Sequence, residues 1–428
     1  MKYKNKKTVY DSYERGLNGR MRMEELPETQ VEITYPHPNI PGKMTSQNYI
    51  EYNDIAVVVL VRKCKNGEFQ FGLVEKEAPA FIYDENDEKT AKGYNGIFLE
   101  ANSFAFPDKN QEPENISLWL DDQIWSIGLE MEGMAELDSS KTAICQSFTN
   151  QNARFYVAGV KEGISTETIH WFPISSLESF LDIQRQGGKD NLHSSIQTLY
   201  PLELLRNKYI EQIKNIKPTK FELKEQLPQL ELVSKRIVNS GFRFSIVEVE
   251  YLDINKQKQI ATYLTSRSNA ANTILITKDN KTMFLSPQQR SPYLETNGIK
   301  IEVAGGLTEG KTYEETAMAE LAEEQGFYTE GIKEFTGPLV ATTLNSEISK
   351  AYEAEYENGI EGKQKLDEQE KIGEKIPVNF ENLRKNIKND KLPLTTKYYI
   401  MLKSRDIERE RKIGKKDNLK EKNHGMDE

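Results

Sequence analysis

The sequence predicts an α+β protein in which two similar domains, each a mixed sheet between helices, follow one another. Three observations support this fold class. Short runs of alternating apolar residues, typical of strands, recur along much of the chain. A glycine-rich stretch at residues 305–310 leads into a helical stretch at 313–325 that carries three glutamates near its end. The order of strand and helix candidates in the first half recurs in the second, which indicates a diverged duplication.

A domain boundary is expected near the middle of the chain. Residues 214–229 are charged and contain Pro218 and Pro228, as linkers often do. We therefore expect an arm at 1–29, a first domain at 30–215, a linker at 216–230, a second domain at 231–402 and a charged tail at 403–428. We expect the tail to be a solvated helix or a disordered end rather than a nucleic-acid-binding arm.

Within these bounds, each element follows from local pattern. In the first half, strands are expected at 30–35, 54–62, 68–75, 96–100, 142–148 and 155–160, and helices at 116–131, 173–181 and 201–213. In the second half, strands at 232–238, 242–253, 259–265, 272–278 and 282–286 precede the helix at 313–325. The two halves share a Tyr-x-Ala pattern at residues 154–158 and 350–354.

Composition narrows the possible environments and partners. The 428 residues carry a net charge of −10, which gives no overall reason to bind nucleic acid or an anionic membrane. No apolar run reaches the roughly 18–20 residues that a membrane-spanning helix needs. Cys64 and Cys145 are too few for a disulfide framework, so we expect a reducing, cytoplasmic location.

The helix at 313–325 has clear ends. Thr312 and Glu315 have the spacing of a capping box, so the helix should begin at Tyr313. Gly326 is the natural residue for its C-terminal stop.

The three glutamates of this helix, Glu320, Glu323 and Glu324, are spaced to lie on one side of it. Like charges at this spacing destabilise a helix by roughly 0.2–0.5 kcal/mol per pair, and a divalent cation with oxygen ligands is a usual way to offset that. The alternative is an ordinary solvated acidic face. The glycine-rich stretch at a set distance before the glutamates favours the metal site.

This stretch resembles a Nudix box, whose pattern is G-x5-E-x7-R-E-U-x-E-E-x-G-U, with U apolar. Lys311 stands where the family has its first Glu, and Ala319 stands where it has Arg. The positions that match in register are Gly305, Glu320, Leu321, Glu323, Glu324, Gly326 and Phe327.

Residues 230–400 are most similar to the ADP-ribose and ADP-sugar pyrophosphatases within this family. The resemblance implies hydrolysis of a nucleoside diphosphate linked to another moiety, with Mg2+ or Mn2+ held by Glu320, Glu323 and Glu324. It also implies that Glu347 orients or deprotonates the attacking water. Substrate contacts would come from Arg290, Gly305 and Gly306.

A second interpretation stays open. Both domains could be inactive scaffolds that bind a nucleotide or form a structural part of an assembly such as a phage particle. In that case Lys311 could pair with the glutamates and take the place of the metal. In the first half, counting back from Gly133 leaves only Glu130 of the box, so no catalytic metal is expected there. In the hydrolase interpretation, the resemblance implies that the first half acts as a built-in dimer partner, so that the two halves form an internal pseudo-dimer, and it also allows a homo-oligomer.

Overall fold

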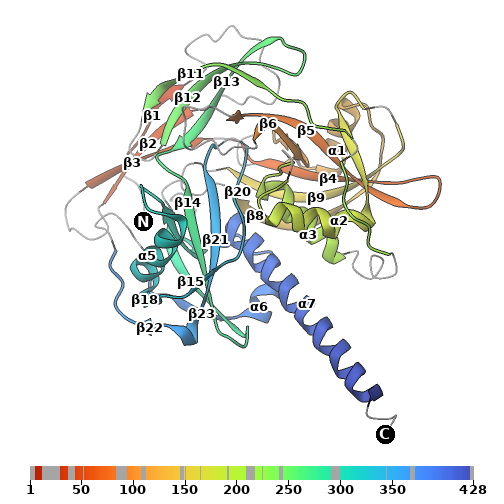
Figure 1. Cartoon of the computed structure of the whole chain (residues 1–428). Helices are drawn as coiled ribbons and strands as arrows, with labels where there is room; N and C mark the ends of the chain where they lie inside the picture. Colours follow the sequence, from red (N-terminus) through yellow and green to blue (C-terminus); the bar gives the residue numbers. More distant parts are fainter. Residues whose placement is uncertain are drawn as a thin grey trace.

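The computed structural model confirms an α+β fold in two parts, each with a mixed sheet and helices (Figure 1). It describes residues 5–11, 29–36, 44–51, 53–82, 94–107, 112–144, 149, 151–163, 165–189, 192–208, 217–223, 225–240, 244–290, 299–343, 345–366 and 372–424. The short helix that residues 13–26 could form lies outside these ranges.

The two large sheets have the same strand order. The first runs β10-β5-β4-β9-β8, with β6 and β7 pairing with β5 and β4. The second runs β23-β15-β14-β21-β19, with β16 pairing with β15, and with β17 and β20 pairing with β14 and β21. The strands of the first are β4 (Ile55–Lys63), β5 (Phe69–Ile82), β6 (Asn95–Glu100), β7 (Asn102–Ala105), β8 (Met131–Ala143), β9 (Asn152–Val160) and β10 (Ile169–Pro173). Those of the second are β14 (Ala270–Ile276), β15 (Thr282–Gln289), β16 (Ile299–Glu302), β17 (Ala304–Leu307), β19 (Ile332–Glu334), β20 (Leu339–Val340), β21 (Ile348–Glu355) and β23 (Ile376–Asn379).

The register of the central strands also corresponds. The parallel pair β4 and β9 sets Tyr156 beside Val58, and the parallel pair β14 and β21 sets Tyr352 beside Thr273. The two tyrosines of the shared Tyr-x-Ala pattern therefore occupy corresponding places. Duplication remains our interpretation, and this recurrence favours it.

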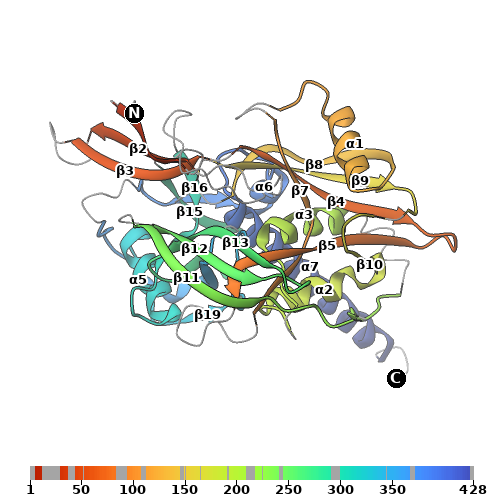
Figure 2. The same ribbon diagram turned by 90° about the horizontal axis from the view of Figure 1, so that it is seen from above.

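Helices cover both faces of the first sheet. Along β4, Val57 and Val59 belong to the core beneath α2 (Leu177–Arg185) and α3 (Ile196–Lys208), while Val58 and Leu60 pack with α1 (Ile116–Ser126) on the other face. Every residue from Ile55 to Val61 is buried, as expected of a central strand covered on both sides. Figure 2 shows α1 and α2 on opposite sides of these strands.

The second sheet is covered in the same way. Leu321 of α5 (Tyr313–Gln325) packs with Leu275 of β14 on one face. Ile274 and Ile276 of the same strand face the core that includes α6 (Phe380–Lys385) and the first part of α7 (Leu394–His424). Short elements join these layers: η1 (Ile174–Ser176), β18 (Phe327–Tyr328), η3 (Tyr356–Asn358) and β22 (Ile360–Glu361).

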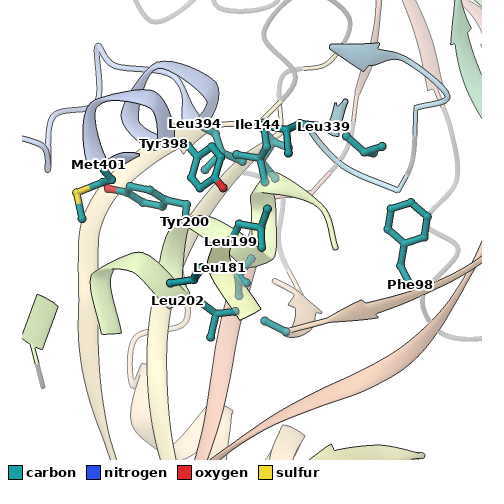
Figure 3. Close-up of a cluster of buried hydrophobic side chains, with 14 of the residues drawn as sticks. Phe98, Ile144, Leu181, Leu199, Tyr200, Leu202, Leu339, Leu394, Tyr398 and Met401 are labelled. Atoms are coloured by element: carbon teal, nitrogen blue, oxygen red, sulfur yellow. The ribbon is translucent and has the colours of Figure 1, made fainter. Parts of the chain in front are cut away.

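One hydrophobic core joins the two halves. α3 of the first half packs against α7 of the second, and Tyr200, Tyr398 and Met401 meet between them (Figure 3). Within this core lies a buried ion pair: Nζ of Lys397 is 2.8 Å from Oδ2 of Asp138, and both side chains are fully buried. α7 then runs outward to the C-terminus (Figure 1).

Each half also has a three-stranded antiparallel sheet before its mixed sheet. In the second of these, Tyr251 donates to a carboxylate oxygen of Glu77 in the first half at 2.8 Å, so this sheet contacts both halves. The strands are β1 (Asn5–Asp11), β2 (Thr29–Pro36) and β3 (Met44–Glu51), then β11 (Glu231–Ser240), β12 (Phe244–Leu252) and β13 (Lys258–Ser266).

Two helix predictions need correction. The helix expected at 116–131 ends at Ser126, because Gly128 with φ of 80° turns the chain and Met131 begins β8. The helix expected at 201–213 begins at Ile196 instead, and its described part ends at Lys208.

Three segments outside the predicted domains form elements or contacts of their own. The arm at 1–29 contains β1. In the linker at 216–230, the buried Phe221 packs on Phe172 with ring centroids 4.6 Å apart. The charged tail begins inside the protein, since Arg405 is fully buried and pairs with Glu203 at 2.9 Å. Further along, residues 410–414 are exposed. Among the described residues, no helix has the length and apolar character to cross a membrane.

Candidate functional site

The helix α5 begins and ends where the sequence predicts. The hydroxyl of Thr312 accepts from the backbone N–H of Glu315 at 3.2 Å, and the Glu315 carboxylate accepts from the N–H of Thr312 at 2.9 Å. The bonds that the Glu315 carboxylate accepts from the N–H and the hydroxyl of Thr312 lower the pKa of Glu315. Gly326, with φ of 60°, ends the helix in the left-handed conformation.

Two of the three glutamates contact the glycine-rich strand β17. Glu324 is only 3% exposed; one carboxylate oxygen accepts from the side-chain amide of Gln288 at 3.0 Å and the other from the N–H of Gly305 at 2.9 Å. The carboxylate of Glu320 lies over Gly306, where a Cβ atom would clash with it. Glycine at this position is therefore required for the close approach. Glu323 is partly exposed on the same helix.

Glu320 and Glu324 are the residues that could hold a magnesium ion whose other ligands were water and phosphate. In the described part of the chain, no three acidic, histidine or cysteine side chains converge into a metal-binding group. Mg2+ often takes only one or two carboxylates from a protein, and Glu320 and Glu324 supply two from successive turns of α5.

Lys311 does not replace a metal in this arrangement. Its side chain is exposed and forms no ion pair with Glu320, Glu323 or Glu324. The hypothesis that Lys311 acts as an internal cation for the glutamates is therefore wrong.

Arg290 makes a bidentate ion pair inside the protein. Its Nε and Nη2 atoms lie 2.7 and 2.6 Å from the two carboxylate oxygens of Glu302, which is 4% exposed. Gln288 lies in β15 and Arg290 follows its last residue. Because residues two positions apart point to the same side of an extended chain, the two side chains reach Glu324 and Glu302 from one side. The role of Glu302 was not recognised from the sequence, although it lies on the strand that pairs with β15.

Burial changes the protonation equilibrium of Glu347, which lies near this helix. Removal from water raises the pKa of its carboxyl group to about 7, while the Ser266 hydroxyl and the positive charge of Arg290 act in the opposite direction. The nearby phenols are Tyr313 of α5 and Tyr399 of α7. A carboxyl group with this pKa can exchange a proton near neutral pH.

In the first half, the described helix α1 corresponds to α5, and an aromatic cluster packs against it. At α1, Trp119 packs on Phe106 and Phe104 with ring centroids 5.3 and 6.4 Å away. Glu130 lies beyond the end of α1, on the surface, where it pairs with Lys161. Counting back from Gly133 therefore placed the first-half box wrongly, and Glu130 has no counterpart role to the glutamates of α5.

Comparisons with known proteins identify no family for this chain. No family model matches the sequence, and no curated protein does. A solved structure described as that of an ADP compounds hydrolase is similar over 44% of this chain and 98% of its own, with 15% identity and a TM-score of 0.37. A TM-score this low supports no conclusion about activity.

Proposed function

We propose that residues 231–402 are a Nudix-type hydrolase that cleaves the diphosphate of a nucleoside diphosphate linked to another moiety, of the ADP-ribose or ADP-sugar class. One observation carries the proposal: the carboxylates of Glu320 and Glu324 lie against the backbone of Gly305 and Gly306. Because these glycines have no side chains, both carboxylates can approach the backbone of β17 closely, on the helix that resembles a metal-binding helix.

The acidic helix α5 would bind Mg2+ or Mn2+ through Glu320 and Glu324, with Glu323 on the same side of the helix. A bound divalent ion neutralises phosphate charge and lowers the pKa of the attacking water. Ala319 stands where the family has arginine, so the bonds from Gln288 and Gly305 to Glu324 would orient this carboxylate instead.

Glu347 would act as the general base. Its pKa of about 7 keeps a useful fraction of the carboxylate ionised at neutral pH while leaving it basic enough to take a proton from water. Arg290 is held by Glu302, so we assign it a role in maintaining positive charge near Glu347 rather than a bidentate clamp on phosphate.

A second candidate function is a catalytically inactive scaffold or nucleotide-binding protein, for example a structural component of an assembly. It is favoured by the internal partners of Arg290 and Glu324, which hold the site together without any ligand.

Release of AMP from ADP-ribose in the presence of Mg2+ or Mn2+ separates the two candidates. The hydrolase should show metal-dependent release and a metal-dependent rise in melting temperature. That rise would correspond to about 2.7 kcal/mol at a hundredfold the metal dissociation constant. Glu324→Gln should remove both effects, because it removes a ligand charge with little change in volume. If the wild type shows no release of AMP and no metal-dependent rise in melting temperature, the result supports the scaffold.

A further inference from the structure

The segment that leads to Glu347, residues 335–343 and 345–347, is held by parts of the chain far away in sequence. We call it the Glu347 segment. It contains the short strand β20, whose Leu339 is 3% exposed and lies in the core shared by the two halves (Figure 3). Because Glu347 is the last residue of this segment, whatever fixes the segment also fixes the carboxyl group.

The first half supplies three backbone contacts to the beginning and middle of the segment. The N–H of Gly337 donates to the carbonyl oxygen of Arg185 at 2.8 Å, and the N–H of Gln197 donates to that of Ala341 at 3.2 Å. Nε of Arg185 donates to the carbonyl oxygen of Phe335 at 3.0 Å. Gly337 also lies so close to the backbone of Gln186 that a Cβ atom would not fit.

The side chain of Arg185 joins three elements. It lies at the end of α2, its guanidinium stands 4.5 Å from the ring centroid of Phe335, and its two terminal nitrogens lie 2.5 and 2.7 Å from the carboxylate of Asp406 on α7. A bidentate pair of this kind fixes orientation as well as distance. Arg185 therefore connects the first half, α7 and the start of the Glu347 segment.

The other end of the segment is held by β13. The N–H of Ser346 donates to the carbonyl oxygen of Leu264 at 3.0 Å, and the hydroxyls of Ser346 and Thr265 are 2.9 Å apart. The Ser266 side chain also lies beside the Glu347 carboxyl group, where it opposes the rise in the pKa of that group. The segment is thus fixed at one end by the first half and at the other by the antiparallel sheet.

We propose that the first half serves the active site of the second as a positioning partner, with Arg185 as the positioning residue that fixes the Glu347 segment. This inference rests on the proposed function for the role of Glu347. It assigns to the half without a catalytic site a task other than stability alone: keeping Glu347 in its desolvated place.

The test compares Arg185→Ala and Arg185→Lys with a matched control, Arg409→Ala. Arg409 also joins α7 to α2, through Asp182 at 2.7 Å, but has no bond to the Glu347 segment. In Arg185→Lys the positive charge beside Asp406 is kept, so this variant should fold even if Arg185→Ala does not. It lacks the second nitrogen of the guanidinium, so it cannot make the bidentate pair.

We measure amide hydrogen exchange at residues 335–347 and the pH dependence of ADP-ribose hydrolysis. In Arg185→Ala, exchange in the segment should rise about tenfold or more, as expected when a local opening becomes easier. The pH midpoint of kcat should fall by roughly one unit as Glu347 gains water, with Ser266, Arg290, Tyr313 and Tyr399 still around it. Arg185→Lys should shift the exchange rate of the segment and the pH midpoint of kcat in the same directions, but by less. Arg409→Ala should change neither quantity.

Two results would overturn the positioning role. One is an exchange rate in the Glu347 segment of Arg185→Ala equal to that of the wild type. The other is an equal rise of that rate in Arg409→Ala. Exchange does not require hydrolysis. Should the wild type release no AMP, the proposed function fails while the exchange result still decides whether Arg185 fixes the segment.

Discussion

Where the second half has Gly306, the first half has Phe104. Both residues pair with an alanine of the central strand, Ala271 in β14 and Ala56 in β4, at corresponding register. The carboxylate of Glu320 occupies the space above Gly306, whereas the ring of Phe104 packs towards Trp119 of α1. The same sheet and helix thus accommodate either a polar site or an aromatic cluster, depending on whether one strand position has a side chain.

The position of Glu347 differs between the halves in the same way. The N–H of Ile348 donates to Oδ1 of Asn269 at 3.2 Å, and the N–H of Asn152 donates to Oδ1 of Asp54 at 2.9 Å, so these two pairs correspond. The residue before Asn152 is Gln151, the neutral counterpart of Glu347. The proposed site therefore differs from the corresponding part of the first half in a few side chains on a common framework.

The largest expected effect concerns the contact between the halves. Lys397→Ala leaves the carboxylate of Asp138 buried without its cation, which should lower the free energy of unfolding by about 3–5 kcal/mol. The halves should still unfold in one transition in urea, because they share a core. Separate transitions for the two halves would contradict this.

A matched pair of changes at the corresponding strand positions should separate activity from stability. Gly306→Ala forces Glu320 to move and should reduce hydrolysis by about 100-fold, the order expected when a catalytic group is misplaced by roughly 1 Å. Phe104→Ala should leave hydrolysis unchanged. Replacing a fully buried phenylalanine by alanine lowers the free energy of unfolding by about 3–5 kcal/mol, and we expect a smaller loss here because Phe104 is only partly buried. Equal rates for Gly306→Ala and wild type would show that Glu320 is not part of the site.

Glu347→Gln makes the second half resemble the first and should change the pH dependence of stability. The pKa of Glu347 is about 7 in the folded protein and near 4.5 when solvated, so the folded state binds the proton more tightly. Wild-type stability should therefore fall as pH rises from about 4.5 to 7, and the variant should be more stable above pH 7 by roughly 1–3 kcal/mol. Denaturation in urea at pH 5 and 8 measures this difference, and parallel losses in both proteins would contradict it.

The smallest effect is expected at the helix caps, where the halves are alike. Asn115 caps α1 by accepting from the N–H of Leu118 at 3.2 Å, as Thr312 caps α5. Thr312→Ala and Asn115→Ala should each lower the free energy of unfolding by about 1 kcal/mol. A lower free energy of unfolding in one variant and no change in the other would contradict the expectation that the two caps contribute equally.

Local features of the site could be predicted from the sequence. The start of α5 at Tyr313 and its stop at Gly326 are confirmed, because capping residues act within a few positions of the helix end. The Tyr-x-Ala repeat also marked two strands that occupy corresponding places. The α+β class in two parts followed from these patterns.

Partners distant in sequence could not be predicted. Arg290 pairs with Glu302 rather than staying open for a phosphate, and Lys397 pairs with Asp138 across the two halves, because pairing depends on sheet register and helix packing. The apolar spacing of residues 116–131 continued past the true end of α1, since β8 is also partly apolar and the turn at Gly128 interrupts the helix. Neither fact is encoded in periodicity alone.

Hydrolysis of ADP-ribose by wild type, Glu324→Gln and Glu112→Gln tests the central claim most directly. Glu112 is the matched control: it is a carboxylate of the first half that pairs with Arg154 at 2.7 Å and accepts from Tyr156 at 2.8 Å. We predict Mg2+-dependent release of AMP by wild type and Glu112→Gln, and a loss of about 100-fold or more in Glu324→Gln. Equal rates in all three proteins, or no release by any of them with Mg2+ or Mn2+, would contradict a catalytic site in the second half.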